Sequence, residues 1–119
     1  MLKVLLISLF LTVSAFGVDS DTEVKSISSK DLSSYKHVIF QKEKNFNITE
    51  LTLKVNEPVV FVNKDPIVHN VFSQSGKHSF NLKAQVPESA SVVVFKSPGR
   101  AEVFCAIHPR MKMLITIVE

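Results

Sequence analysis

The clearest pattern in the chain is an alternation of apolar and polar residues near its middle. Leu51, Leu53 and Val55 alternate with polar side chains. A period of two places the three apolar side chains on one face of an extended strand and the polar ones on the other. This segment is therefore predicted to be a strand with one buried face.

The apolar run that follows is different, because it has no polar face. Residues 58–63 read PVVFVN, with apolar side chains at four consecutive positions. Such a run is typical of a strand in the middle of a sheet that begins at its proline. We expect this strand to be covered on both sides.

Short runs of β-branched and aromatic residues continue to the C-terminus, separated by turn residues, and no segment has the periodicity of an amphipathic helix. Seven or eight short strands without a helix predict an all-β fold, an antiparallel β-sandwich of the Greek-key type, with one domain over residues 35–119. The remaining predicted strands are His37 to Gln41, Val68 to Ser73, Val92 to Phe95, Arg100 to Cys105 and Leu114 to Val118.

Residues 1–17 have the pattern of a secretory signal peptide. Lys3 supplies a positive charge, an apolar stretch covers residues 4–13, and Ala15 and Gly17 place small residues where a signal peptidase requires them. The stretch is shorter than the roughly 20 residues that a membrane-spanning helix needs. We expect cleavage after Gly17, export to the periplasm and no membrane anchor afterwards. Residues 18–34 are mainly polar and are expected to form a flexible N-terminal segment.

Composition excludes several functions. The chain has one cysteine, so it can form neither an internal disulfide nor a structural zinc site rich in cysteine. Its formal charge of +3 comes from scattered basic residues rather than the clustered stripe of a nucleic-acid-binding surface, so nucleic acid is not an expected partner. In an exported protein a lone thiol is buried and inert, paired between chains, or bound to a metal.

The residues around the cysteine favour the metal. Cys105 is followed by His108 and Met111 in the loop between the last two predicted strands, and His69 begins an earlier strand. Two imidazoles, a thiolate and a weak thioether are the donor set that copper takes in blue-copper electron-transfer sites. Zinc would not need the thioether.

In two segments, LTLKVNEPVVFVNKDPIVHNV and PGRAEVFCAIHPRMKMLITIV, the sequence resembles the cupredoxins, the type 1 blue copper proteins. The short Cys-x2-His-x2-Met loop with a proline after its histidine is most similar to that of the amicyanins. The resemblance implies one copper ion with His69, Cys105 and His108 as equatorial ligands and Met111 as the axial ligand. It also implies that the edge of His108 reaches an apolar surface patch and passes the electron. The candidate rim of that patch is Pro66, Ile67, Pro109 and Arg110.

Two residues of this loop differ from those in the similar loops of the amicyanins. Ile107 replaces a proline, which leaves a backbone N–H free to donate to the Cys105 thiolate. Met113 replaces a glycine and places a second thioether near the site, so it competes with Met111 as axial ligand. Asn70, directly after the first histidine, is expected to connect the ligand segments by hydrogen bonds.

The sequence therefore predicts a soluble, monomeric one-electron carrier that cycles copper between Cu(II) and Cu(I), with separate redox proteins as donor and acceptor. It is not expected to be an enzyme. A periplasmic copper chaperone or copper-sequestering protein is the alternative, because Met111 and Met113 offer soft ligands. A cysteine hydrolase built on Cys105 is weaker, since no helix is predicted to activate the thiolate. The two other histidines, His37 and His78, are expected on the surface.

Overall fold

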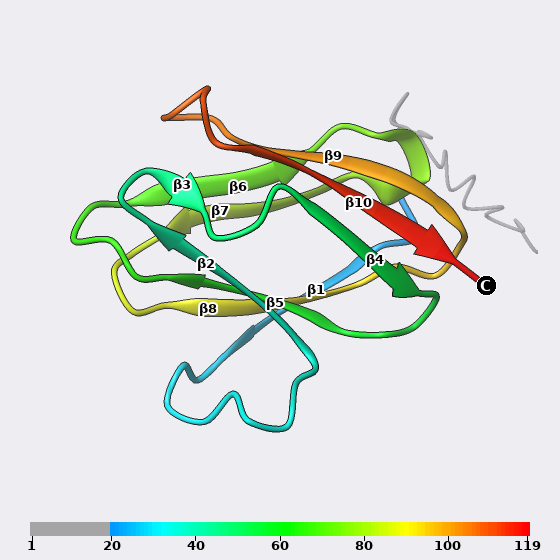
Figure 1. The fold of residues 1–119 in the computed structure, drawn as a ribbon, viewed down its shortest axis with the longest axis horizontal. Helices are drawn as coiled ribbons and strands as arrows, with labels where there is room; N and C mark the ends of the chain where they lie inside the picture. Colours follow the sequence, from blue (N-terminus) through cyan, green and yellow to red (C-terminus); the bar gives the residue numbers. More distant parts are fainter. Residues whose placement is uncertain (1–19) are drawn as a thin grey trace, which may run out of the picture.

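The computed structural model describes residues 20–119, so the predicted signal peptide lies outside the described residues. They form two five-stranded sheets packed face to face (Figure 1). One sheet has the spatial order β1 (Glu23–Ile27), β8 (Ala90–Val94), β5 (Val59–Asn63), β2 (His37–Lys42) and β3 (Asn45–Phe46). The other has the order β4 (Glu50–Lys54), β10 (Lys112–Val118), β9 (Gly99–Cys105), β6 (His69–Ser73) and β7 (Phe80–Gln85). One turn of 3-10 helix, η1 (Gly76–His78), precedes β7.

The predicted all-β sandwich is confirmed, but it has more strands than expected and is not wholly antiparallel. Strands β2 and β5 pair in parallel, as do β4 and β10, while the other pairs are antiparallel. Strands β1, β3 and β7 were not predicted. They lie at sheet edges, where backbone hydrogen bonds on one side hold a strand and fewer apolar side chains are required. No helix among residues 20–119 is both long and apolar enough to cross a membrane.

The main core fills the space between the sheets. Phe61, at the centre of β5, is fully buried, and its ring contacts those of Phe46 and Phe80 at centroid distances of 6.3 and 5.9 Å. Removing a phenylalanine of this kind typically costs about 3–5 kcal/mol. This aromatic centre fixes how the two sheets stack, and thereby the relative positions of the strand ends.

A second apolar cluster explains why β5 has no polar face. Val60 and Val62 point away from the main core, yet both are fully buried. Leu32 and Tyr35, from the long loop between β1 and β2, pack against this cluster. That loop hangs below the first sheet in Figure 1. The expected cover on both sides of residues 58–63 is present, and a loop supplies half of it.

The ordered sheet begins earlier than the predicted domain boundary at residue 35. Strand β1 lies in the segment expected to be flexible, and it pairs antiparallel with β8 from Glu23 opposite Val94 to Ile27 opposite Ala90. Four of its five side chains are exposed, so backbone hydrogen bonds rather than side-chain burial hold it. Because the residues of β1 are mainly polar, the hydrophobic pattern of the sequence did not predict this strand.

Candidate metal centre

Three donor atoms from two distant segments meet at one end of the sandwich. The Cys105 sulfur lies 3.6 Å from Nδ1 of His69 and 3.9 Å from Nδ1 of His108. The donor atoms of the three residues all lie within 4.8 Å of one another. The pairing of Val71 with Cys105 between β6 and β9 brings the first histidine beside the cysteine.

The His69 ring is held at both nitrogens. The side chain is fully buried, and its Nε2 lies 2.6 Å from Oδ2 of Asp65. An ionised carboxylate only accepts hydrogen bonds, so Nε2 carries the proton and Nδ1 presents its lone pair toward the sulfur. The fold therefore prepares His69 to bind a metal through Nδ1.

Asp65 was not identified as a site residue from the sequence. Its carboxylate also accepts hydrogen bonds from the backbone amides of Glu43 and Lys44, in the turn between β2 and β3. Burial by itself raises the pKa of Asp65, but the Lys44 amide, the His69 ring and the Glu43 amide together outweigh it and hold the pKa below its ordinary value. The one feature of the sequence that could have identified Asp65 is its position, as an acidic residue four positions before His69.

His108 is held much more loosely than His69. It lies in the loop after β9 and is partly exposed, and its ring packs edge-on against that of His69 at a centroid distance of 5.1 Å. Among residues 20–119, no group forms a hydrogen bond with its Nε2. His108 therefore reaches the surface, whereas His69 is fully buried.

Backbone hydrogen bonds fold the loop back on itself. The Met111 amide donates to the His108 carbonyl at 2.9 Å, and the Cys105 amide donates to the Met111 carbonyl at 3.1 Å. Met111 is 1% exposed. The loop thus returns Met111 to the level of Cys105, on the inside of the protein.

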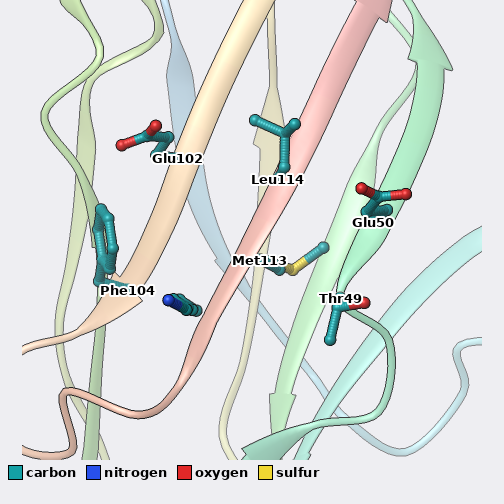
Figure 2. A pocket seen from close by; sticks show the side chains of 7 residues that line it. Thr49, Glu50, Glu102, Phe104, Met113 and Leu114 are labelled. Atoms are coloured by element: carbon teal, nitrogen blue, oxygen red, sulfur yellow. The ribbon is translucent and has the colours of Figure 1, made fainter.

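Met113 is placed differently. It is the second residue of β10, opposite Val103, and belongs to the main core. It also lines a surface pocket of about 510 Å³, and Figure 2 shows its thioether turned toward Thr49 at the β4 side of β10. This direction leads away from β9, the strand that carries Cys105.

Asn70 connects the ligand segments mainly through its backbone. Its amide donates to the Cys105 sulfur at 3.5 Å, and its carbonyl accepts from the Ala106 amide at 3.0 Å. The side chain turns away and donates to Asn81. The Ile107 amide makes no hydrogen bond to the sulfur among the described residues, and the Ile107 side chain is exposed. Of the two backbone amides expected to donate to the sulfur, those of Asn70 and Ile107, only the Asn70 amide does so within residues 20–119.

The donor set fits a metal ion of the expected kind. Two donors at about 2.0–2.3 Å from one ion and about 120° apart lie about 3.8 Å from each other, which matches the two sulfur–nitrogen distances. The mixture of imidazole nitrogen and thiolate sulfur suits copper. The cluster of His69, Cys105 and His108, with Met111 beside it, is consistent with a type 1 copper site.

Comparison with known proteins supports the fold. No family model matches the chain. Amicyanin of Paracoccus versutus is 26% identical over 94 residues, which cover 76% of this chain and 71% of that protein. The crystal structure of amicyanin from the same organism superimposes with a TM-score of 0.73 at 23% identity, covering 82% of this chain and 98% of that one. The Cu(I) form of an amicyanin mutant gives 0.72 at 19% identity, covering 81% and 97%.

The chain has an amicyanin-like cupredoxin fold. The predicted resemblance to cupredoxins is thereby confirmed. In this fold, the end of the sandwich that holds the donor cluster, here called the copper end after its candidate metal, is formed by the last residues of β5 and β9 and the first residues of β6 and β10. The donor residues are far apart in sequence and meet there for this reason.

The burial of Cys105 disfavours a role as the nucleophile of a hydrolase. A cysteine nucleophile must reach a substrate, but Cys105 is 2% exposed and lines neither of the two described pockets. The contact of its sulfur with His69 lies inside the protein. A short Cys–His distance without access for a substrate fits metal binding better than an open catalytic pair.

The two remaining histidines lie at the other end of the cupredoxin sandwich and are less exposed than the sequence suggested. His78 is 8% exposed and its Nε2 lies 3.0 Å from the Ser97 carbonyl oxygen. His37 is half-buried and its Nε2 lies 2.9 Å from Oε2 of Glu57. Both expectations of a surface position were wrong, because each ring packs against another segment that supplies a hydrogen-bond acceptor.

Proposed function

We propose that the protein is a small one-electron carrier with a type 1 copper ion held by His69, Cys105 and His108 and, at longer range, by Met111. One observation carries this proposal: the two buried donors and the partly exposed His108 converge on one point from two separate segments. A buried site with a single partly exposed imidazole allows electron exchange while keeping the ion inside. The carrier is not itself an enzyme.

Bound copper supplies a Cu(II)/Cu(I) couple that accepts and returns one electron. The residues of this chain keep the donor positions fixed. His69 lies on a strand and is held from behind, Cys105 ends a strand, and the Asn70 carbonyl connects the two segments through Ala106. Fixed donors need little rearrangement when the oxidation state changes, which favours fast transfer. The buried cluster also keeps water from the thiolate.

The surface around His108 suits transient docking of redox proteins. Ile67, Val68 and Ile107 are exposed apolar side chains of the two loops at this end, with exposures of 37%, 38% and 53%. Apolar residues with a polar rim are typical of contacts that form and dissociate rapidly. We propose that donor and acceptor proteins dock here in turn, in the periplasm if residues 1–17 direct export.

A copper chaperone requires ligands that another protein can reach. Met111 and Met113 are 1% and 4% exposed, so neither thioether is available for handing the metal on. The burial of both side chains favours a carrier over a chaperone. Repeated reduction and reoxidation in the presence of a competing Cu(I) chelator distinguishes them, because a carrier retains its copper and a chaperone loses it.

The decisive experiment adds Cu(II) to the purified mature protein and records the visible and electron paramagnetic resonance spectra. We expect an intense thiolate-to-copper charge-transfer band with one copper bound per chain. Cys105→Ser should abolish the band and retain the β-sheet circular dichroism. His37→Gln is the matched control and should keep the colour. A wild-type protein that binds copper without the band would overturn the proposal.

A further inference from the structure

A buried carboxylate stands directly behind the candidate metal centre and belongs to no predicted part of it. Asp65 is 6% exposed and contacts three groups: Nε2 of His69 and the backbone amides of Glu43 and Lys44. All three are donors. The carboxylate therefore receives hydrogen bonds from two directions, one from a metal ligand and one from a neighbouring turn.

The turn that contacts Asp65 is conformationally costly. Glu43 and Lys44 both have left-handed backbone angles, with φ of 53° and 57°. This conformation is unfavourable for residues other than glycine, so the turn needs compensating contacts. The two hydrogen bonds to Asp65 supply them and also fix where the carboxylate lies.

A network of buried amide side chains holds the other side of Asp65. The Asn63 side chain accepts a hydrogen bond from the Asp65 amide at 2.9 Å and donates to the carbonyls of Ile67 and Gln85 at 2.8 Å each. The loop from β5 to β6 is thus tied to β7 at the base of the site. Asp65 has little freedom to move away from His69.

We propose that Asp65 is a positioning residue of the copper centre: it holds His69 in the tautomer that binds through Nδ1, and its negative charge lowers the reduction potential. This inference rests on the proposed function and deepens it. A hydrogen bond from the imidazole to a carboxylate makes the ring a stronger donor. A negative charge one imidazole away from the ion stabilises Cu(II) more than Cu(I), because Cu(II) carries the larger charge.

The test compares two carboxylates that both contact an imidazole Nε2. Asp65→Asn removes the charge behind His69, and Glu57→Gln removes the corresponding charge behind His37 at the other end of the sandwich. We expect Asp65→Asn to shift the Cu(II)/Cu(I) preference about tenfold toward Cu(I), a rise of about 59 mV for one electron. Glu57→Gln should leave the potential unchanged. An unchanged or lower potential in a folded, blue Asp65→Asn protein overturns the inference.

Two further measurements keep the test decisive if Asp65→Asn unfolds. The same substitution in a Lys44→Gly background relieves the left-handed strain of the turn, so that loss of the turn contacts is less costly. Nitrogen-15 NMR of the metal-free wild-type protein reports the His69 tautomer independently of copper. We expect a protonated Nε2, and a ring protonated at Nδ1 instead would overturn the positioning role. If the tautomer is as expected but copper gives no blue band, the proposed function fails while the Asp65 contact stands.

Discussion

The two ends of the sandwich use histidine in different ways. At one end, the Nε2 of His69 contacts Asp65 and its Nδ1 faces the Cys105 sulfur. At the other end, the Nε2 of His37 contacts Glu57 at a similar distance, and that of His78 contacts a backbone carbonyl. A carboxylate partner and burial are therefore common to both ends.

What separates them is the surroundings of the second ring nitrogen. Nδ1 of His69 points to a group of further metal donors, whereas the His78 ring packs against Phe95 at a centroid distance of 6.0 Å and covers Gly99. Burial alone thus does not identify a ligand. The proposed metal site thus lies at one end and the structural histidines at the other, and substitutions can test both roles.

The largest contrast should come from removing one buried histidine at each end. His69→Ala should abolish the blue copper spectrum, because it deletes an equatorial donor and leaves Asp65 without its ring partner. His78→Ala should retain the spectrum and lower the free energy of unfolding by about 1–3 kcal/mol through lost packing and a lost hydrogen bond. Visible spectra and urea unfolding of both variants measure the two effects. Retention of the band in His69→Ala would contradict the assignment.

The remote end of the sandwich, which carries His37 and His78, can be destabilised by a substitution that leaves the copper end unchanged. A Cβ at Gly99 would lie 2.3 Å from Cε1 of His78, and the residue has a φ of 151° that other residues rarely adopt. Gly99→Ala should lower the free energy of unfolding by about 2–4 kcal/mol. Gly76→Ala is the matched control, because its φ is also positive but no atom lies within 4 Å of the added Cβ.

Urea unfolding of the two glycine variants provides the measurement. Gly76→Ala should cost only the backbone term, about 1–2 kcal/mol, and both variants should keep the copper spectrum of the wild type. Equal losses in the two variants would show that the His78 ring moves aside easily and does not support this end.

At the copper end, the two methionines should behave differently. Met111→Leu should change the reduction potential and leave the charge-transfer band largely intact, as expected when a weak axial thioether is lost. Met113→Leu should leave the potential unchanged and cost less than about 1.5 kcal/mol, since it is a volume-conserving change in the core. Cyclic voltammetry of the two variants checks this. A larger shift in the Met113 variant would make Met113 the axial ligand.

The smallest expected effect concerns pH at the remote end. The hydrogen bond from His37 holds the pKa of Glu57 below its ordinary value of 4.5. A depressed pKa means that the native state binds this proton less readily than the unfolded state, so the interaction stabilises the protein above pH 4.5 and is lost as the pH falls through the lower native value. Melting temperatures measured from pH 6 down to about pH 3 should converge between wild type and Glu57→Gln. A constant difference across this range would show that the contact does not depend on the Glu57 charge.

Local spacing made part of this protein predictable from sequence. Alternation at Leu51, Leu53 and Val55 and the apolar run at residues 58–63 indicate strands because side-chain direction in a strand depends only on position along the chain. The Cys105, His108 and Met111 spacing lies within one loop of seven residues, so the chain itself keeps these donors close. His69 could be added because it resembles a known ligand position.

The tertiary structure decided the contacts between distant segments. Asp65 meets Glu43 and Lys44 only because β2 and β5 pair in parallel, and no local pattern encodes that pairing. The exposed strand β1 joins the sheet through backbone hydrogen bonds, which polar side chains do not reveal. Met113 was separated from Met111 by the register of β10 with β9, and His37 and His78 acquired acceptors from other segments. Composition and spacing identify which metal donors are available. Strand register and packing decide which group lies beside the second ring nitrogen of each histidine.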